Sequence, residues 1–383
     1  MIKYTEAIND YNHKRYNKVI DSLLIYTLNG FDDDVYYYLS MSYLKTNNID
    51  LFLNYAKLYV NNYKNTVKSD IYLPLFNTLL NKNDMISAYK VLINMNNLNL
   101  ADHYQFYLLG HKFKNKCQKK SLECFNLSIK INDKFVPTYN SIGCIFHNEK
   151  NYSEAIKNFE YCIKLNNNYC DAYHNLGVTY TELNDFDNGI KNYNKILTIK
   201  KQDPDCLFNM STLLLKFKYF EKGFIYYEFR LKCKKLEKTY PKITDKLENW
   251  DGKANCKKLL IVYEQGIGDN IQFYRYIMEL SDIYPNMKLT FFCKKNIIHL
   301  FKKNDKITLI SELPNNVEKL FDYKIYIMSL PKILCIENIT PLKYNYLNYN
   351  IPKNLFWKNK LNNNRFKIGV IFSIQRIFGN DII

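Results

Sequence analysis

Units of about 34 residues repeat through the middle of the chain, and this period constrains the fold more than any other feature. Successive units begin at Val136, Cys170 and Pro204, and each carries aromatic and aliphatic residues at the spacing of one helix face. A unit of this length forms a helical hairpin, whose apolar face stays exposed until a neighbouring hairpin covers it. The repeat therefore predicts an α solenoid.

Small residues recur where paired helices must approach closely, at Gly143, Ala155, Gly177 and Gly189. Together with the period, they resemble the tetratricopeptide repeat family. On this resemblance we expect tetratricopeptide-like helical repeats over residues 1–235, in five to seven hairpins. The pattern is clearest over residues 136–230 and weaker in the first hundred residues.

Polar residues occupy one position near the middle of each first helix: Ser141, Asn175 and Asn209. Here the chain resembles the repeats of the protein O-GlcNAc transferase type, in which asparagines at this position line an inner groove and hold peptide backbone. The resemblance implies a protein or peptide partner, because an amide side chain can both donate to and accept from a backbone. The alternative is that these residues are only solvated polar groups in an asparagine-rich chain.

The charge balance raises the question of nucleic acid. The formal net charge is +17, but only five of the 54 basic residues are arginine. Forked contacts to bases and phosphates favour arginine over lysine. The composition therefore argues against nucleic acid as the partner.

Cysteine spacing and hydropathy exclude several further classes. The ten cysteines form no Cys-x-x-Cys pair and no His-x-x-x-His accompanies them, so we expect reduced thiols and no metal site. No run of about 18 apolar residues occurs, and the start MIKYTEAIND lacks the apolar core of a signal peptide. We expect a cytoplasmic protein without a membrane span.

The pattern changes after residue 235. Residues 236–258 are polar and basic and are predicted to be a linker. From 259 to 362, apolar segments of strand length alternate with helical segments, which predicts a parallel sheet in an α/β, Rossmann-like domain. The candidate strands are Leu259–Tyr263, Lys288–Cys293, Lys306–Ser311 and Tyr323–Met328.

A loop with two glycines, Gly266 and Gly268, follows the first predicted strand, at the end where open α/β sheets bind ligands. Its spacing matches neither a dinucleotide fingerprint, because Ile271 replaces the third glycine, nor a phosphate-binding P-loop. Four segments nevertheless occur in the order found in a bacterial family that joins tetratricopeptide repeats to a glycosyltransferase domain: WDG from Trp250, LLIVYEQGIGDNIQFYRYI from Leu259, FDYKIYIMSLPKIL from Phe321 and FKIGVIF from Phe366. That family is similar to the O-GlcNAc transferase and SPINDLY group, and its loop is similar to that of lipopolysaccharide heptosyltransferases.

The resemblance implies a GT-B architecture, in which residues 259–362 form the Rossmann-like acceptor-side domain. Asp269 matches the loop aspartate of the heptosyltransferases and becomes a candidate general base that takes a proton from the acceptor hydroxyl. By the same resemblance Gly266 and Gly268 shape the acceptor loop, and Gln265, Gln272 and Arg275 orient groups near it. The alternative role of Asp269 is to cap the following helix.

The resemblance stops early in the second half of the GT-B fold. Residues 363–383 correspond only to the truncated start of the donor-binding domain. We therefore expect no sugar transfer by the chain alone and no cofactor, with a nucleotide sugar bound only if a separate donor-domain polypeptide supplies its site. Two hypotheses follow: a truncated or split glycosyltransferase, and a protein–protein interaction scaffold that works through its repeat groove.

Overall fold

The computed structural model describes residues 2–27, 33–62, 68–241, 243, 246–302, 305–337 and 346–347. They fall into two compact units, Met1–Asn167 and Asn168–Ile383. The boundary predicted at residue 235 lies inside the second unit. The predicted start of a donor-binding domain, residues 363–383, lies outside the described residues.

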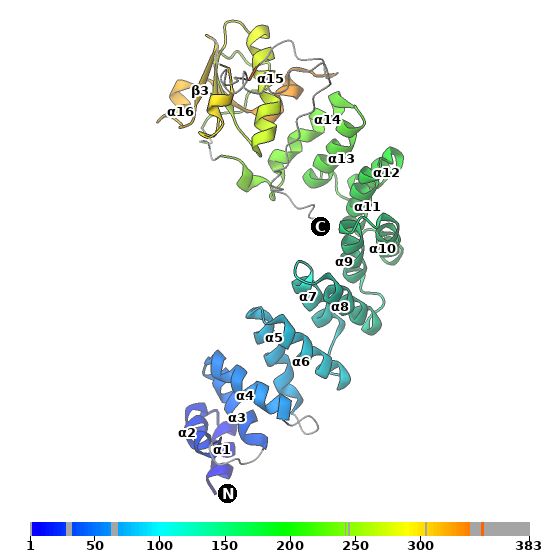
Figure 1. Cartoon of the computed structure of the whole chain (residues 1–383), viewed down its shortest axis with the longest axis vertical. Coiled ribbons are helices and arrows are strands. Elements are labelled where there is room, and N and C mark those ends of the chain that lie inside the picture. The colour runs from blue at the N-terminus through cyan, green and yellow to red at the C-terminus, as the bar shows by residue number, and fades with distance from the viewer. Residues whose placement is uncertain are drawn as a thin grey trace, which may run out of the picture. The chain divides into compact units, whose positions relative to one another are not determined.

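Consecutive helices pack in pairs through the first unit (Figure 1). The pairs are α1 (Ile2–Asn12) with α2 (Tyr16–Thr27), α3 (Asp33–Lys45) with α4 (Ile49–Asn62), α5 (Tyr72–Asn81) with α6 (Met85–Asn97), α7 (His103–Phe113) with α8 (Gln118–Ile131), and α9 (Val136–Asn148) with α10 (Tyr152–Leu165). A short 3-10 turn, η1 (Ser69–Ile71), precedes α5.

The second unit begins with two more pairs and two short 3-10 turns. They are α11 (Cys170–Glu182) with α12 (Phe186–Ile199), α13 (Pro204–Lys216) with α14 (Phe220–Tyr227), η2 (Glu228–Lys232) and η3 (Glu237–Thr239). The described residues thus hold seven helix pairs, the upper end of the predicted range, and the helical solenoid is confirmed.

The turns inside several pairs share one local device. A residue with a left-handed backbone comes directly before the N-cap of the second helix, as at Asn184 (φ 60°) before Asp185. Asparagine tolerates this conformation better than most residues, and the Asp185 carboxylate then accepts from the backbone N–H of Asn188 at 3.1 Å. The same order of left-handed residue and cap occurs at Lys150 with Asn151. Local sequence therefore sets where these second helices start.

Close packing within the pairs depends on the small residues that the sequence repeats. A Cβ built on Gly177 would lie 2.6 Å from Cε1 of Tyr193, whose ring is fully buried. Gly143 stands in the same relation to Phe159, at 2.5 Å. The aromatic ring of the second helix therefore fills the space that the missing side chain leaves on the first.

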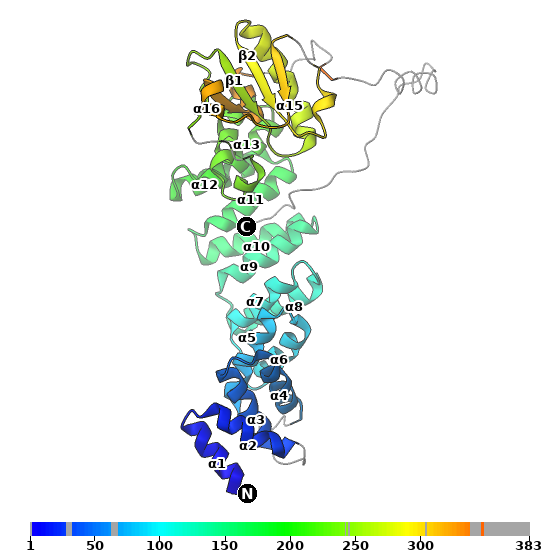
Figure 2. The ribbon, with the colours of Figure 1, turned by 90° about the vertical axis from the view of Figure 1, so that its left-hand side faces the viewer.

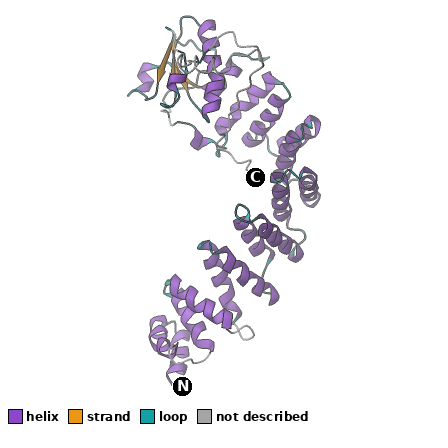
Figure 3. Ribbon diagram, viewed as in Figure 1, coloured by secondary structure: helices purple, strands orange, loops and turns teal. Residues whose placement is uncertain are grey.

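A four-stranded parallel sheet follows in the second unit (Figures 2 and 3). Its strand order is β3-β2-β1-β4. Its strands are β1 (Lys258–Val262), β2 (Lys288–Phe292), β3 (Ile307–Ile310) and β4 (Tyr323–Tyr326). The remaining elements are α15 (Ile267–Ile283), η4 (Ile298–Leu300), α16 (Val317–Leu320), η5 (Ile327–Ser329) and α17 (Leu330–Ile333). All four predicted strands are confirmed to within two residues at each end, and the relation of this small sheet to a GT-B fold stays a prediction.

Both faces of β1 are buried, as expected for the middle of a parallel sheet. Leu259 and Ile261 belong to the core that also contains Ile277 of α15. Leu260 and Val262 point to the other face, because side chains alternate along a strand, and lie in a second apolar cluster. This sheet core places the loop after β1 at the edge where β1 and β4 both end.

The predicted linker packs against the sheet where the structure describes it. Trp250 is buried and donates its backbone N–H to the carbonyl of Lys324 at 2.8 Å. Leu247 joins the apolar cluster on one face of the sheet. Residues 246–258 are therefore part of the α/β portion, although the sequence pattern indicates only a polar connector.

Hydropathy identifies no bilayer-spanning helix in the described part of the chain.

Candidate functional site

The glycine loop after β1 turns sharply into α15. Gln265 has a left-handed backbone (φ 57°), and Gly266 is the N-cap of the helix. The backbone N–H of Gly266 donates to Oδ2 of Asp269 at 3.0 Å. Asp269 therefore occupies the capping geometry that the sequence offers as its alternative role, while its role as a general base stays a prediction.

Asn270, which is not among the predicted site residues, fixes this loop further. Its buried side-chain Nδ2 donates to the carbonyl of Glu264 at 3.0 Å and to that of Gly266 at 2.6 Å. Without this side chain the Gly266 carbonyl would keep only the longer hydrogen bond from the backbone N–H of Asn270, at 3.4 Å. The position of Asn270 directly after Asp269 could have identified it from the sequence, because an asparagine there can reach back across the first turn of α15.

The other predicted acceptor-loop residues point in different directions. Gln265 donates from Nε2 to the Tyr227 hydroxyl at 3.5 Å. Gln272 is exposed, and among the described residues no atom lies within 4 Å of the place a Cβ on Gly268 would occupy. Arg275 pairs with Glu279 on its own helix at 3.4 Å. The structure therefore brings Gln265, Gly266 and Asp269 together, and Gln272 and Arg275 lie further along α15.

A buried ion pair that sequence reasoning missed lies beside this loop. Arg230, in η2, and Glu264, two residues after β1, both have side chains with 0% exposure. Arg230 donates from Nε to Oε2 of Glu264 at 2.9 Å and from Nη2 to Oε1 at 2.8 Å. This two-pronged geometry is the strongest form of an arginine–carboxylate contact.

The remaining polar atoms of the pair are also satisfied. Arg230 Nη2 donates to the Ser329 hydroxyl at 2.8 Å, and Nη1 donates to Glu228 at 2.7 Å. The backbone N–H of Met328 donates to Glu264 Oε1 at 2.8 Å. Burial alone would lower the pKa of the Arg230 guanidinium, but the Glu264 carboxylate raises it above its usual range, so the arginine stays charged.

The position of this pair matters for ligand binding. The chain runs from β1 outward to β2 and β3 and then returns to β4 on the other side of β1, so the connections diverge between β1 and β4. Open α/β sheets bind ligands outside the carboxyl ends of the strands at such a point. Here Arg230 contacts Glu264 after β1 and Ser329 after β4, so the chain's own guanidinium occupies that edge.

The three predicted groove residues of the repeats differ in exposure. Asn175 has 0% exposure and Ser141 has 4%, whereas Asn209 is partly exposed. Ser141 Oγ lies 3.0 Å from His111 Nε2 and donates to the carbonyl of Pro137 at 2.9 Å. The peptide-binding role of all three stays a prediction.

A histidine beside Asn175 adds a titratable group to this region. Asn209 Nδ2 lies 2.5 Å from His174 Nε2 and also donates to the carbonyl of Asp205 at 2.8 Å. A donor facing Nε2 favours the neutral imidazole. Burial lowers the pKa of His174 below its usual value and the charge of Lys235 acts in the same direction, against an opposing hydrogen bond with Asn175.

His174 should make the second unit less stable in mild acid. Because its folded-state pKa lies below the unfolded value of about 6.5, its contribution is full above that pH and is lost as the pH falls toward the folded-state pKa. We expect the free energy of unfolding to fall by up to about 1.4 kcal/mol per pH unit below pH 6.5 from this residue. Urea unfolding of the wild type and His174→Gln at several pH values checks this; equal pH slopes in the two proteins would contradict it.

An open groove lies on the surface of the α11–α12 pair. Its volume is about 380 Å³, and it is lined by Tyr173, Lys191, Asn192, Asn194, Lys195 and Thr198. Both lysines and Asn194 are exposed, whereas Asn192 is buried and donates to the carbonyl of Asn188 at 2.8 Å. We call this surface the α12 groove; it offers ammonium, amide and aromatic groups to a partner.

Comparisons with known proteins agree with the repeat architecture. Residues 136–169 and 171–203 match the family model described as tetratricopeptide repeat. A comparison with curated proteins finds no match.

Several solved structures are similar to part of the chain. YrrB, described as a TPR protein with an unusual peptide-binding site, is 18% identical, with 46% of this chain and 90% of that chain covered and a TM-score of 0.37. MamA protein is 20% identical, with 43% of this chain and 95% of that chain covered and a TM-score of 0.37. The pilF protein of Pseudomonas aeruginosa is 17% identical, with 43% of this chain and 75% of that chain covered and a TM-score of 0.36. On the family match, residues 136–169 and 171–203 are tetratricopeptide repeats.

Proposed function

We propose that this chain is a protein-interaction scaffold whose tetratricopeptide repeats bind a segment of a partner protein. The observation that carries the proposal is the α12 groove, which lies on a helix pair that matches the repeat family. Its exposed Lys191 and Lys195 supply charge, and the Asn194 amide can donate to and accept from a peptide backbone. These groups suit an extended peptide with acidic side chains.

The sheet edge supports a binding role over a catalytic one. Arg230 occupies the carboxyl edge between β1 and β4, where an α/β enzyme would hold its ligand. Asp269 accepts from the backbone of its own loop, which is sufficient reason for an aspartate at that position.

Peptide selection with matched variants tests the scaffold. Peptides are first selected from a displayed library by their binding to the purified full chain. These peptides should bind the variant Lys191→Glu/Lys195→Glu about tenfold more weakly than the wild type, a loss of about 1.4 kcal/mol of binding free energy. Lys201→Glu/Lys222→Glu makes the same change in net charge at two exposed lysines outside the α12 groove and should bind normally. Fluorescence anisotropy measures both. No selected peptide, or equal weakening in the two variants, would contradict the proposal.

The second candidate is the acceptor half of a GT-B glycosyltransferase, in agreement with the motif order from Trp250 onward. One observation favours it: the Gly266–Asp269 loop sits at the carboxyl end of a strand in a parallel sheet. In this function a donor-binding domain would hold the nucleotide sugar, and Asp269 would act as the base toward an acceptor hydroxyl. Transfer of labelled sugar from UDP-N-acetylglucosamine by the full chain mixed with a separately expressed donor-binding domain, lost in Asp269→Asn, would establish it; no transfer by that mixture would leave the scaffold.

A further inference from the structure

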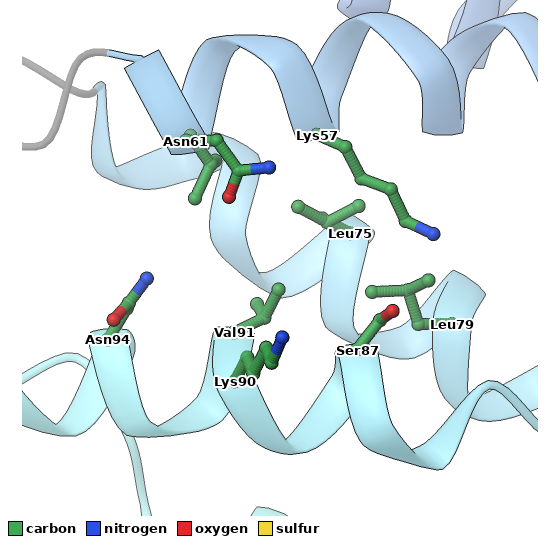
Figure 4. Close-up of a pocket in the computed structure, with 9 residues that line it drawn as sticks. Lys57, Asn61, Leu75, Leu79, Ser87, Lys90, Val91 and Asn94 are labelled. Carbon is green, nitrogen blue, oxygen red and sulfur yellow. The ribbon is translucent and has the colours of Figure 1, made fainter.

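A second groove lies in the first unit, outside the residues that match the repeat family. It runs between α4 and α6 above α5 (Figure 4). Its floor consists of four buried aliphatic residues, Val60, Leu75, Leu79 and Val91. We call this surface the α4–α6 groove.

Polar side chains form the rim of the α4–α6 groove. Lys57 and Asn61 come from α4, and Lys90 and Asn94 come from α6 (Figure 4). Lys57 Nζ pairs with Asp84 at 3.1 Å, which neutralises part of its charge. Lys90 is exposed and forms no ion pair within the part of the chain that the structure describes, so it is the cation available to a partner.

The volume limits what can enter. The α4–α6 groove measures about 150 Å³, the room of about five water molecules at about 30 Å³ each. One aliphatic side chain of leucine size fills such a space and meets the aliphatic floor. A carboxylate beside it would reach the Lys90 ammonium, and the two rim amides can bond a peptide backbone.

We propose that the α4–α6 groove binds a short acidic segment of a partner protein, with one aliphatic side chain on the floor and a carboxylate at Lys90. Charge argues against the end of this chain or a second copy as the occupant, because residues 338–383 carry seven lysines and arginines against one aspartate and two copies of net charge +17 repel each other. A nucleic acid suits the groove poorly, since none of the described residues that line it is aromatic or an arginine, as stacking or forked contacts require. This site is separate from the α12 groove and does not depend on it.

Fluorescence anisotropy with a defined probe tests the proposal. The probe is fluorescein-labelled DEELDE peptide, and the controls are NQQLNQ, which lacks the charges, and DEESDE, which lacks the aliphatic side chain. We expect the probe to bind the full chain at low salt more tightly than either control. Lys90→Glu should weaken it about fivefold, from reversal of one exposed attraction.

Two further variants distinguish the groove from general attraction. Asn94→Trp fills the α4–α6 groove without changing the charge and should also weaken the probe about fivefold or more. Lys119→Glu changes the charge as Lys90→Glu does, at an exposed position on α8, and should leave the affinity within twofold. The proposal is wrong if Lys119→Glu weakens the probe as much as Lys90→Glu does, or if DEESDE binds as tightly as DEELDE. Complete competition by a single-stranded oligonucleotide would also overturn it. The variant Lys191→Glu/Lys195→Glu tests the α12 groove separately, so a failed prediction at one groove is distinguishable from a failed prediction at the other.

Discussion

Replacing Arg230 by methionine should lower the free energy of unfolding of the second unit by about 3–5 kcal/mol, because it leaves the Glu264 carboxylate buried without its countercharge. Glu264 would keep only the backbone N–H of Met328 as a partner among the contacts described above. Urea unfolding measures the effect. A Trp357→Phe background leaves Trp250, which is buried in this unit, as the single tryptophan reporter.

A matched substitution and a double variant separate the ion pair from simple loss of a long side chain. Lys216→Met removes an exposed cation in the same unit, with its hydrogen bond to the Thr181 carbonyl at 2.6 Å, and should cost about 1 kcal/mol or less. Arg230→Met/Glu264→Leu removes both charges and should recover much of the lost stability, since the penalty comes mainly from the unpaired charge. The interpretation fails if Arg230→Met costs no more than Lys216→Met.

Placing valine at Gly177 should destabilise the α11–α12 pair by about 3 kcal/mol, since a Cβ there would lie 2.6 Å from the Tyr193 ring. The ring is fully buried and packed, so it cannot swing away as the end of a flexible side chain can. Thermal and urea unfolding of the full chain in the same single-tryptophan background measure the loss.

Two further variants make the Gly177 result specific. Tyr193→Leu removes the ring that the new side chain would strike, so Gly177→Val/Tyr193→Leu should be more stable than the sum of the two single changes predicts. Gly268→Ala adds a Cβ where no atom lies within 4 Å and should change stability by less than about 1 kcal/mol. Strict additivity of Gly177→Val and Tyr193→Leu would show that the close approach is not the cause.

Most of the fold could be predicted because it depends on local periodicity. The 34-residue period and the small residues at Gly143 and Gly177 predict closely packed helix pairs, and the structure has these pairs, with an aromatic ring of the second helix against each glycine. The four strands were predictable for a similar reason, because short apolar segments between helical ones have few other arrangements. Boundaries were less predictable, since Trp250 and Leu247 pack against the sheet from a segment that reads as a polar linker.

The candidate site was predictable only in part. The sequence predicts the loop Gln265–Asp269, because glycines and an aspartate come after an apolar segment of strand length. The structure places this loop at the carboxyl end of β1. The sequence offers two roles for Asp269, and the distance from Gly266 N to its carboxylate shows that it caps the helix. Exposure was not predictable: Asn175 has the same repeat position as Asn209 but is buried.

By itself, the sequence determined the helix pairs, the parallel strands and the position of the glycine loop, because spacing along the chain sets secondary structure and its apolar faces. Only the tertiary structure decided that Arg230 and Glu264 meet, since 34 residues separate them and neither lies in a motif that requires the other. The same holds for the α4–α6 groove, whose floor and rim come from three helices. Such contacts depend on how elements pack, and charge or polarity at one position does not reveal which distant side chain will face it.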